Sequence, residues 1–549
     1  MRLYNNEKRS TYFNTTNTEY RLLNPPTVST KYNYIPIFTW LIPAMVSGLF
    51  PASAQTFPKR ELRAAWIATV KNIDWPSQSG LGAHEQQAEY VRLLDLLKSV
   101  GMNAVIVQVR PTADAFYPSS YEPWSEYLSG QQGRSPEPYY NPLTFMIGEA
   151  RRRGLEFHAW FNPYRVSMED SVSFAQIHPI HKHPEWFVKY GGKWYYDPGH
   201  PEAQEFVLQS IMETVKHYDL DAVHFDDYFY PYRIANEVFP DSCSYASYGA
   251  AYHNVDDWRR SNVDFFVREL SKRIKQEKPH VKFGISPFGV WRNQDKDPEG
   301  SQTQAGQTNY DDLYADVLKW LKEGWIDYVV PQLYWHIGFK VADYSVLLDW
   351  WSKHCHGRHL YIGQAVYRIG GKGWEDPEEL ANQVALNRTY DEVKGSMYFS
   401  AKTFVQDKLD VNAKMRTIYP YPALIPPMDW IDAKPPATPA FQHVSGSPER
   451  GVSLTWADLA GTDASYYVVY RFENGNLISV NTPGNIVAIV PRQSSAIQSW
   501  EDRTAAKRTM YSYGITAVDR THNESPLSEV MAIRTRGKKG AIRIISPRP

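Results

Sequence analysis

Residues 86–110 read QQAEYVRLLDLLKSVGMNAVIVQVR, and this stretch decides the fold because it joins one helix to one buried strand. Apolar residues recur at helical spacing through Gln86–Val100, and Gly101 then supplies a helix-ending signal. The run Ala104–Arg110 that follows is short, apolar and β-branched, which is typical of a buried strand. The stretch therefore predicts one α/β unit of a parallel sheet.

The same alternation of short apolar runs and longer helical runs extends from Glu61 to about Tyr419. Further helix patterns occupy Glu202–Tyr218, which opens at Pro201, and Trp258–Glu277. The predicted strands are Leu62–Val70, Ala104–Arg110, Glu156–Phe161, Ala222–Asp227, Lys282–Pro287, Tyr328–Leu333, Leu360–Ala365 and Ser396–Ser400. Eight such repeats predict a (β/α)₈ barrel over residues 59–420. A doubly wound open sheet is the alternative, but no Gly-rich phosphate loop follows any strand.

A second pattern follows the barrel region. Residues 421–439 are rich in proline, which is typical of a semi-rigid linker. Residues 440–535 alternate with period two between turn signals, which predicts a small all-β sandwich. This part resembles a fibronectin type III module, with Trp456 as a buried ring and Tyr513 near a strand corner. Residues 536–549 form a basic tail.

The N-terminal region carries an export pattern. Ile35–Phe50 is apolar, and Ala52-Ser53-Ala54 follows it as a small-residue cleavage site. Residues 1–54 are therefore predicted to be a signal peptide, and the protein to be periplasmic, cell-surface or secreted. The apolar run is short and interrupted by proline, so we expect no transmembrane anchor.

Composition excludes several classes of function. The net charge is −1, so no basic field suits nucleic acid. The two cysteines, Cys243 and Cys355, could pair with each other but form neither a disulfide framework nor a zinc site. No cofactor motif or metal-ligand cluster is evident, since the closely spaced His178, His181 and His183 lie in a Pro-rich loop. Aromatic residues make up 14% of the chain, and their flat faces suit the stacking of sugars.

The candidate site lies at the carboxyl ends of the strands, where barrels of this kind carry their chemistry. The fourth strand ends His224-Phe-Asp-Asp-Tyr228. Because side chains alternate along a strand, a Phe225 that faces the helices places His224, Asp226 and Tyr228 toward the barrel axis. Asp226 and Asp227 are then candidate carboxylates for glycosidic cleavage. The non-catalytic alternative is that Asp226 or Asp227 forms an ion pair with Arg110, Arg165 or Arg292.

Glycosidic hydrolysis normally uses two carboxylates. Asp114, after the second strand, is the candidate partner, and Asp74, Asp295 and Asp297 are weaker ones. A substrate-assisted reaction, in which Asp226 and Tyr334 hold the sugar, needs only one. Most strand ends combine an aromatic residue with Arg, Asn or Gln, which suits a neutral polar ligand. The substrate-binding candidates are Arg110, Trp160, Asn162, Tyr164, Arg165, His224, Tyr228, Trp291, Gln332, Tyr334 and Trp335.

Several long motifs, in order, closely resemble the bacterial glycosyl-hydrolase-like family ten. They are Glu61–Val70 with Asp74-Trp-Pro76, Val107–Tyr117, Ala159–Arg165, Asp197–Pro201, Asp221–Pro231 and Ile285–Trp291. The resemblance covers about Lys59 to Tyr419 and implies a (β/α)₈ barrel and an exported hydrolase. Some members of that family are associated with peptidoglycan glycan strands stripped of stem peptides, which makes this glycan a candidate substrate.

Three functions follow from these patterns. A glycosidase that acts on a polysaccharide is the main prediction. A carbohydrate-binding protein on a barrel without turnover is the first alternative, because the second carboxylate is not evident. A surface or scaffold protein, in which the C-terminal module contacts other proteins or the cell surface, is the second. The first two differ in whether Asp226 is needed for turnover.

Overall fold

The computed structural model describes residues 57–459, 461, 463–473, 477–536 and 542–545. The predicted signal peptide, residues 1–54, lies outside the described residues, and so does most of the predicted basic tail. Both remain predictions from the sequence.

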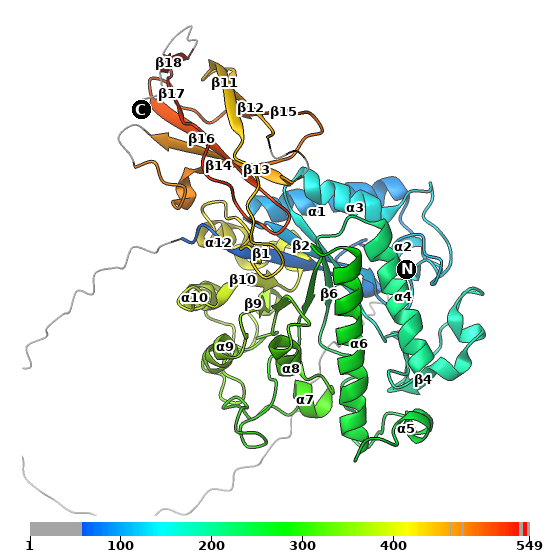
Figure 1. The fold of residues 1–549 in the computed structure, drawn as a ribbon. Coiled ribbons are helices and arrows are strands. Elements are labelled where there is room, and N and C mark those ends of the chain that lie inside the picture. The colour runs from blue at the N-terminus through cyan, green and yellow to red at the C-terminus, as the bar shows by residue number, and fades with distance from the viewer. Residues whose placement is uncertain (1–56, 460, 462, 474–476, 537–541, 546–549) are drawn as a thin grey trace, which may run out of the picture. The chain divides into compact units, whose positions relative to one another are not determined.

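Eight parallel strands close into a barrel, in the order β1-β10-β9-β8-β7-β6-β3-β2 (Figure 1). The strands are β1 Leu62–Ile67, β2 Ala104–Arg110, β3 Glu156–Phe161, β6 Ala222–Phe225, β7 Lys282–Ile285, β8 Tyr328–Val329, β9 His359–Gln364 and β10 Val393–Tyr398. The predicted barrel is confirmed, and the open-sheet alternative is wrong because β1 pairs with both β2 and β10. Predicted and observed bounds coincide for β2 and β3.

Helices surround the barrel and account for most of its outer layer (Figure 1). They are α1 Ala83–Ser99, α2 Glu126–Ser129, α3 Pro142–Arg152, α4 Pro201–His217, α5 Ser242–Tyr248, α6 Val255–Glu277, α7 Asn309–Asp312, α8 Val317–Lys322, α9 Tyr344–Lys353, α10 Glu379–Asn387, α11 Ala401–Val405 and α12 Val411–Ile418. Pro201 occupies the first turn of α4, as its fixed φ favours. Gly101 follows α1 with φ +91°, a conformation that L residues avoid. In the described part of the chain, every helix is too short or too polar to cross a membrane.

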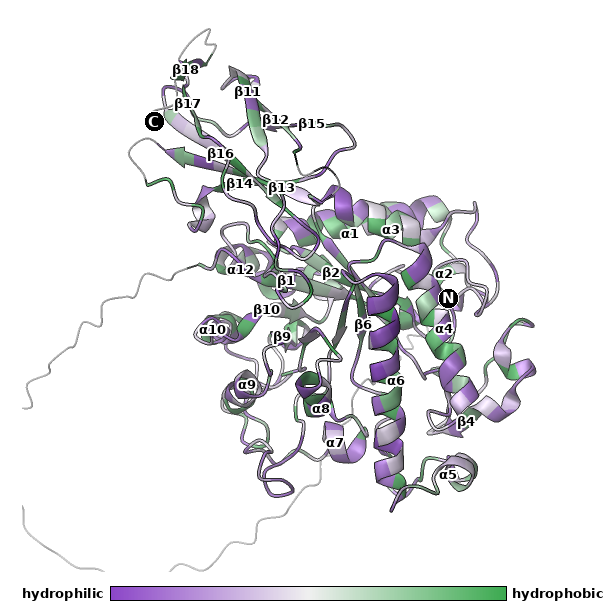
Figure 2. Cartoon of the chain, viewed as in Figure 1, coloured by the Kyte–Doolittle hydropathy of each residue, from purple (hydrophilic) through white to green (hydrophobic). Residues whose placement is uncertain are grey.

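Alternation along each strand separates two apolar cores. Val223 and Phe225 of β6 belong to the core between barrel and helices, where Phe225 packs against Phe266 of α6. Residues of opposite parity, such as Ala222 and Trp160, belong to the core inside the barrel. Figure 2 shows α6 with hydrophilic residues over most of its visible surface, as expected of an outer-layer helix. The expectation that Phe225 faces the helices is therefore confirmed.

The region after residue 439 is all-β, as predicted. One antiparallel sheet has the order β11-β12-β15 and a second has the order β14-β13-β16-β17-β18. These strands are β11 Ala440–Ser447, β12 Gly451–Ala457, β13 Tyr466–Glu473, β14 Ile486–Pro491, β15 Ile497–Asp502, β16 Met510–Val518, β17 Met531–Arg534 and β18 Arg543–Ile545. Trp456 is fully buried, and the buried Tyr513 donates a hydrogen bond to Asp502 over 2.8 Å. The likeness to a fibronectin type III module stays a prediction.

Residues 421–439, the predicted linker, contribute to the interior of the barrel. Ile425 and Met428 belong to the inner core. The turn before residue 524 also contacts the amino-terminal ends of the barrel strands, since Lys282 Nζ lies 2.9 Å from Nε2 of His522. Glu156, at the start of β3, pairs with the same lysine. The end of the barrel opposite the candidate site is thus closed by protein, so substrate access belongs to the carboxyl-terminal end.

Candidate active site

Three polar side chains continue the inward-facing rows of the barrel beyond the ends of its strands. Trp160, Ala222 and Val330 belong to the inner core. Two residues after Trp160 comes Asn162, and two after Val330 comes Gln332. Asp226 has the same parity as Ala222. The period of two thus predicts that these polar groups point toward the barrel mouth, and the contacts below bring them together.

Asp226 is 8% exposed and accepts a 2.6 Å hydrogen bond at Oδ2 from Nδ2 of Asn162. Burial raises the pKa of Asp226, while the positive charge of Arg165 and the hydrogen bond from Asn162 oppose that rise. Asp226 is therefore a desolvated carboxyl whose charged form has dedicated partners. Such perturbed groups in a barrel mouth are characteristic of catalytic sites.

A chain of side chains fixes Asn162. Its Oδ1 accepts hydrogen bonds from Gln108 Nε2 at 2.6 Å and from Arg165 Nη2 at 2.8 Å. The carbonyl oxygen of the Gln108 amide accepts from the backbone nitrogens of Thr69 and Val70, both at 2.9 Å. Because both amide groups are oriented by fixed partners, the NH₂ of Asn162 must point toward Asp226. The ends of β1, β2, β3 and β6 are joined in this way.

Asp227 is the second carboxyl of the site and is 5% exposed. Burial raises its pKa first, and the adjacent charge of Asp226 raises it further. The phenol of Tyr232 donates a hydrogen bond to Oδ2 of Asp227, which lowers the pKa but does not offset the rise. The two carboxyls titrate as a pair, and Asp226 ionises first because Arg165 and Asn162 stabilise its charge. Asp227 therefore keeps its proton to higher pH.

His224 lies one layer below Asp226, inside the barrel. Its Nδ1 is 3.1 Å from the hydroxyl of Tyr328, and its Nε2 accepts a hydrogen bond from Trp66 Nε1 over 3.3 Å. Burial holds the pKa of His224 well below its usual range, so the ring is neutral. Fully buried and engaged at both nitrogens, His224 supports the floor of the site, where we had predicted a substrate contact.

Aromatic residues rim the two carboxyls. Tyr228 hydrogen bonds to Arg165 through its hydroxyl and lies under the guanidinium, with Cζ 5.3 Å from the ring centroid. Burial raises the pKa of Tyr334, and the charges of Tyr367 and of the two carboxyls add to this rise. Trp335 packs edge-on against Phe288 at 5.5 Å. Tyr228, Tyr334 and Trp335 are all partly exposed, so they can contact a ligand.

Several predicted site residues lie elsewhere. Arg110 is fully buried and pairs with Glu122, which fixes the loop after β2. Tyr164 packs against Phe266 in the outer core although it has the same parity as Asn162, because β3 ends at Phe161 and alternation no longer holds beyond it. Trp291 stacks on Trp350 and is 4% exposed. Tyr164 and Trp291 are structural, whereas Arg110 supports the site through hydrogen bonds from its guanidinium to the backbone carbonyls of Asn162 and Pro163. Trp160 reaches the site, since it helps to stabilise the charge of Asp226.

The candidate partner carboxylate Asp114 is fully buried. One oxygen accepts from the backbone of Thr112 at 3.0 Å, and burial raises the pKa of Asp114 to about 7. The side chain of Ser125 opposes this rise, so the group belongs to the loop after β2. No contact connects it to Asp226 among the described residues.

The weaker acid candidates are also engaged or remote. Asp74 accepts hydrogen bonds from the backbone of Ala68, from Ser400 and from the backbone of Lys402, each over 2.7 Å. Asp297 pairs with Arg292, and Asp295 is exposed. Arg110 and Arg292 thus have other partners, and no ion pair of Asp226 or Asp227 occurs in the described part of the chain. The ion-pair interpretation is wrong for Arg110 and Arg292, whereas Arg165 still acts on Asp226 through its positive charge.

Two functional residues were missed in the sequence. Gln108 sits at an inward position of β2, and this lone polar residue in an otherwise apolar strand was a usable signal. Tyr232 lies six residues after Asp226, beyond Pro231, where alternation no longer predicts direction. Within the described residues no cluster of His, Cys, Asp or Glu side chains could hold a metal ion. His178 packs on Phe174, and His183 stacks on Trp186.

Known proteins match both the barrel and the full chain. Residues 61–378 match the family described as glycosyl hydrolase-like 10. "Glycosyl hydrolase YngK" of Bacillus subtilis (strain 168) is 49% identical over 498 residues, covering 88% of this chain and 95% of that protein. "Glycosyl hydrolase DigH" of Escherichia coli (strain K12) is 37% identical over 381 residues, covering 64% of this chain and 86% of that protein. Among solved structures, the PgaB (BpsB) glycoside hydrolase domain from Bordetella bronchiseptica aligns with 13% identity and a TM-score of 0.43, covering 65% of this chain and 99% of that chain.

Proposed function

Because this chain belongs to the glycosyl hydrolase-like 10 family, we propose that it cleaves O-glycosidic bonds of a polysaccharide at the Asp226–Asp227 pair. The family and the relatives assign the chain to the glycosidases. One observation carries the choice of site. Two adjacent buried carboxyls with raised pKa values stand at the barrel mouth, where Asn162 after β3 donates a hydrogen bond to Asp226 and Tyr232 donates one to Asp227.

Asp227 is the proposed general acid. Since it keeps its proton to higher pH than Asp226, it can donate that proton to the glycosidic oxygen as the C1–O bond breaks. The leaving sugar departs as an alcohol, and the oxygen of water later bonds to C1 while its proton returns to the site. Tyr232 holds the carboxyl of Asp227 during this exchange.

Asp226 is the proposed charged carboxylate. Arg165 and Asn162 favour its ionised form, so it can stabilise the positive charge that develops at C1. Consecutive residues have Cα atoms only about 3.8 Å apart, so the two carboxyls enter from the same strand end. The other candidate acids, Asp114, Asp74 and Asp297, have hydrogen-bond or ion-pair partners of their own. This arrangement favours a substrate-assisted reaction, in which Asp226 orients a 2-acetamido group whose oxygen attacks C1.

Peptidoglycan glycan strands are the proposed substrate. Their sugars carry 2-acetamido groups, as the substrate-assisted route requires. The export pattern at Ile35–Ala54 and the likeness to family members associated with this polymer support the choice. The mixed aromatic and amide rim also suits a sugar chain, which offers hydroxyl groups and apolar C–H faces.

A digest with mass-spectrometric product analysis tests the substrate. The mature protein is incubated with peptidoglycan, once intact and once stripped of stem peptides. Soluble sugar fragments are expected from the stripped polymer, and their reducing ends identify the bond that breaks. If neither polymer yields fragments while another N-acetylated polysaccharide does, the peptidoglycan assignment is wrong. If the protein only binds the strands, the carbohydrate-binding alternative is correct.

A further inference from the structure

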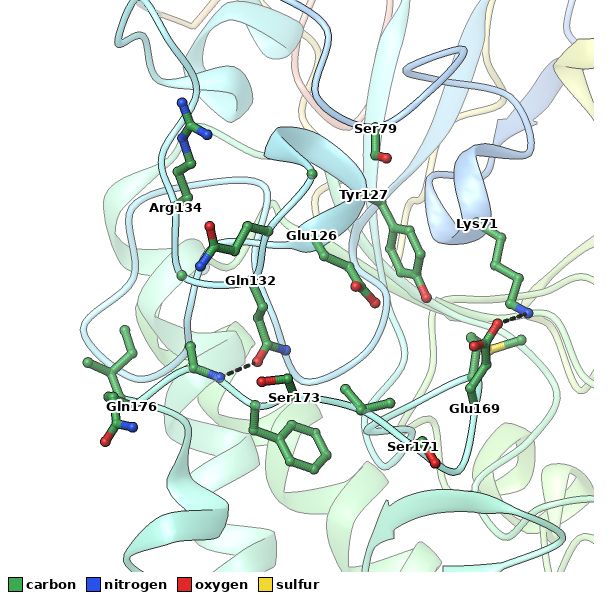
Figure 3. Close-up of a pocket in the computed structure, with 18 of the residues that line it drawn as sticks. Lys71, Ser79, Glu126, Tyr127, Gln132, Arg134, Glu169, Ser171, Ser173 and Gln176 are labelled. Atoms are coloured by element: carbon green, nitrogen blue, oxygen red, sulfur yellow. Dashed lines mark hydrogen bonds and ion pairs between the residues drawn. The ribbon is translucent and has the colours of Figure 1, made fainter.

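A cavity with a volume of about 1000 Å³ lies among loops at the carboxyl-terminal end of the barrel (Figure 3). Its walls come from the loops after β1, β2 and β3, represented by Lys71, Tyr127 and Ser173. All three loops leave the carboxyl-terminal end of the barrel, where Asp226 also lies. The volume is at the upper end of the range for small-molecule sites, so the cavity can hold an extended ligand.

The lining of this cavity is polar but electrically balanced. Lys71 and Arg134 carry positive charge, while Glu126 and Glu169 carry negative charge. Lys71 and Glu169 form a 3.0 Å ion pair across the wall, which Figure 3 shows. Because no sign of charge dominates, the cavity suits a glycan chain with widely spaced charges better than a densely charged polyanion or a cationic peptide.

The remaining lining groups match the surface of a sugar. Gln132 accepts a hydrogen bond from the backbone of Ala175 over 2.9 Å, and its amide NH₂ has no partner among the described residues. In Figure 3 the side chains of Glu126, Tyr127, Gln132 and Ser173 approach a shared space. The rings of Tyr127 and Phe174 are only partly buried and add flat apolar faces. Hydroxyl, amide and carboxylate groups beside aromatic rings can bind sugar hydroxyls and C–H faces together.

Electrostatic contacts connect the cavity with the site. Burial raises the pKa of Tyr127 on the cavity wall, and the charge of Arg165, which bonds to Asn162 and Tyr228 at the site, partly opposes this rise. Burial lowers the pKa of Lys193, and the charges of Arg165 and Lys71 lower it further. Met168 and Glu169 of the cavity wall follow Arg165 by three and four residues in the same loop, so Arg165 lies near both the cavity and the site. A chain that is cleaved at Asp226 and passes over Arg165 would reach this cavity.

We propose that this cavity is a distal sugar-binding subsite that makes the enzyme select long glycan chains over short ones. The proposal rests on the proposed glycosidase function and deepens it, because it defines the substrate as a polymer that occupies both the cavity and the Asp226 site. Sugar units held in the cavity add binding energy that a single disaccharide unit cannot supply.

Two variants of the cavity test this selection. Ser173→Trp fills the cavity, and Phe174→Ala removes one aromatic face. The kcat/KM of each variant is measured on long stem-peptide-free glycan strands and on one disaccharide repeat capped with a chromogenic leaving group. We expect a fall of about tenfold or more on the long strands, equal to about 1.4 kcal/mol, and no change on the short substrate. Ala88→Trp, on the exposed face of α1, is the matched control and should behave as wild type.

The outcomes separate this subsite from the proposed function. If the wild type cleaves both substrates and both variants keep the full preference for long strands, the subsite is wrong while the glycosidase function stands. If the wild type cleaves neither substrate, the proposed function fails, and calorimetric titration with the same strands decides the subsite. Equal affinity of the wild type and Ser173→Trp for the long strands in that titration would overturn it.

Discussion

Asn162 donates a 2.6 Å hydrogen bond from Nδ2 to Oδ2 of Asp226, which joins the end of β3 to the end of β6. The same asparagine is oriented through its Oδ1 by Gln108 and Arg165. The position and charge of the proposed catalytic carboxylate thus depend on residues from three other strand ends. Preorganisation of this kind lets a buried carboxylate stabilise developing charge without first reorganising its surroundings.

Replacement of Asn162 by alanine should narrow the pH range of activity from the acid side. Loss of its hydrogen bond removes one stabiliser of the charged form, so the pKa of Asp226 rises further. The acid limb of the pH profile of kcat/KM, below which Asp226 is protonated and inactive, should therefore move to higher pH. The measurement is a pH profile beside that of Asn481→Ala, an exposed control. If the acid limb stays at the wild-type pH, Asp226 is not the group whose protonation causes that limb.

Replacement of Tyr232 by phenylalanine should extend activity on the basic side. Tyr232 donates a hydrogen bond to Asp227 and thereby lowers its pKa, so its loss lets the pKa rise. Because Asp227 acts as an acid, the basic limb, above which its proton is lost, should move to higher pH. A shift to lower pH would contradict the role of Asp227 as the proton donor. Phenylalanine keeps the ring and its packing against Tyr228, so a shift of the basic limb reports the loss of the hydroxyl group alone.

The sequence was sufficient for the barrel and for the core of the site. Period-two strands between helix patterns predicted all eight barrel strands, and alternation at Phe225 predicted that Asp226 faces the axis. The rule fails at Tyr164, which has the parity of Asn162 but lies in the outer core, because alternation no longer holds once β3 has ended at Phe161. Arg110 shows the limit of the rule, because it has the inward parity yet pairs with Glu122, twelve residues later. Loop partners of this kind depend on tertiary structure, which no local pattern specifies.

The distal cavity was beyond prediction for the same reason. Its residues come from three loops that have no regular period and are separated in sequence by up to a hundred positions. The role of His522 was equally hidden, since this residue contacts Lys282, at the start of β7, across a separation of 240 residues in the sequence. Sequence patterns identify helices and strands and the faces that they bury. The cavity lining and the contact of His522 with Lys282 depend instead on the tertiary arrangement of loops.

Arg110→Ala should destabilise the fold strongly. The side chains of Arg110 and Glu122 are both fully buried, so the substitution leaves an uncompensated carboxylate in the interior. A loss of about 3–5 kcal/mol in the free energy of unfolding is expected. Denaturant titration measures it, with Lys353→Ala as control, because the Lys353–Asp349 pair is exposed and its loss should leave stability unchanged. Equal midpoints for the two variants would show that the buried pair does not stabilise the loop after β2.

His522→Ala should weaken the closed end of the barrel without touching the site. The substitution removes the imidazole that faces Lys282 and leaves that buried ammonium with one partner fewer, at a cost of about 1–3 kcal/mol. Thermal unfolding should shift downward while kcat/KM at low temperature stays at the wild-type value. A large loss of turnover in a folded variant would instead connect the C-terminal sheets to the chemistry.

The most direct test of the central claim compares Asp226→Asn with the wild type on stem-peptide-free glycan strands. Asparagine keeps the size of the side chain but cannot carry the negative charge that Arg165 and Asn162 stabilise. Turnover should fall by at least about a hundredfold while binding of the strands, measured by sedimentation with the polymer, is retained. Asp295→Asn, on an exposed loop, should leave both unchanged. Wild-type turnover in the Asp226→Asn variant would contradict the assignment of the active site to the Asp226–Asp227 pair.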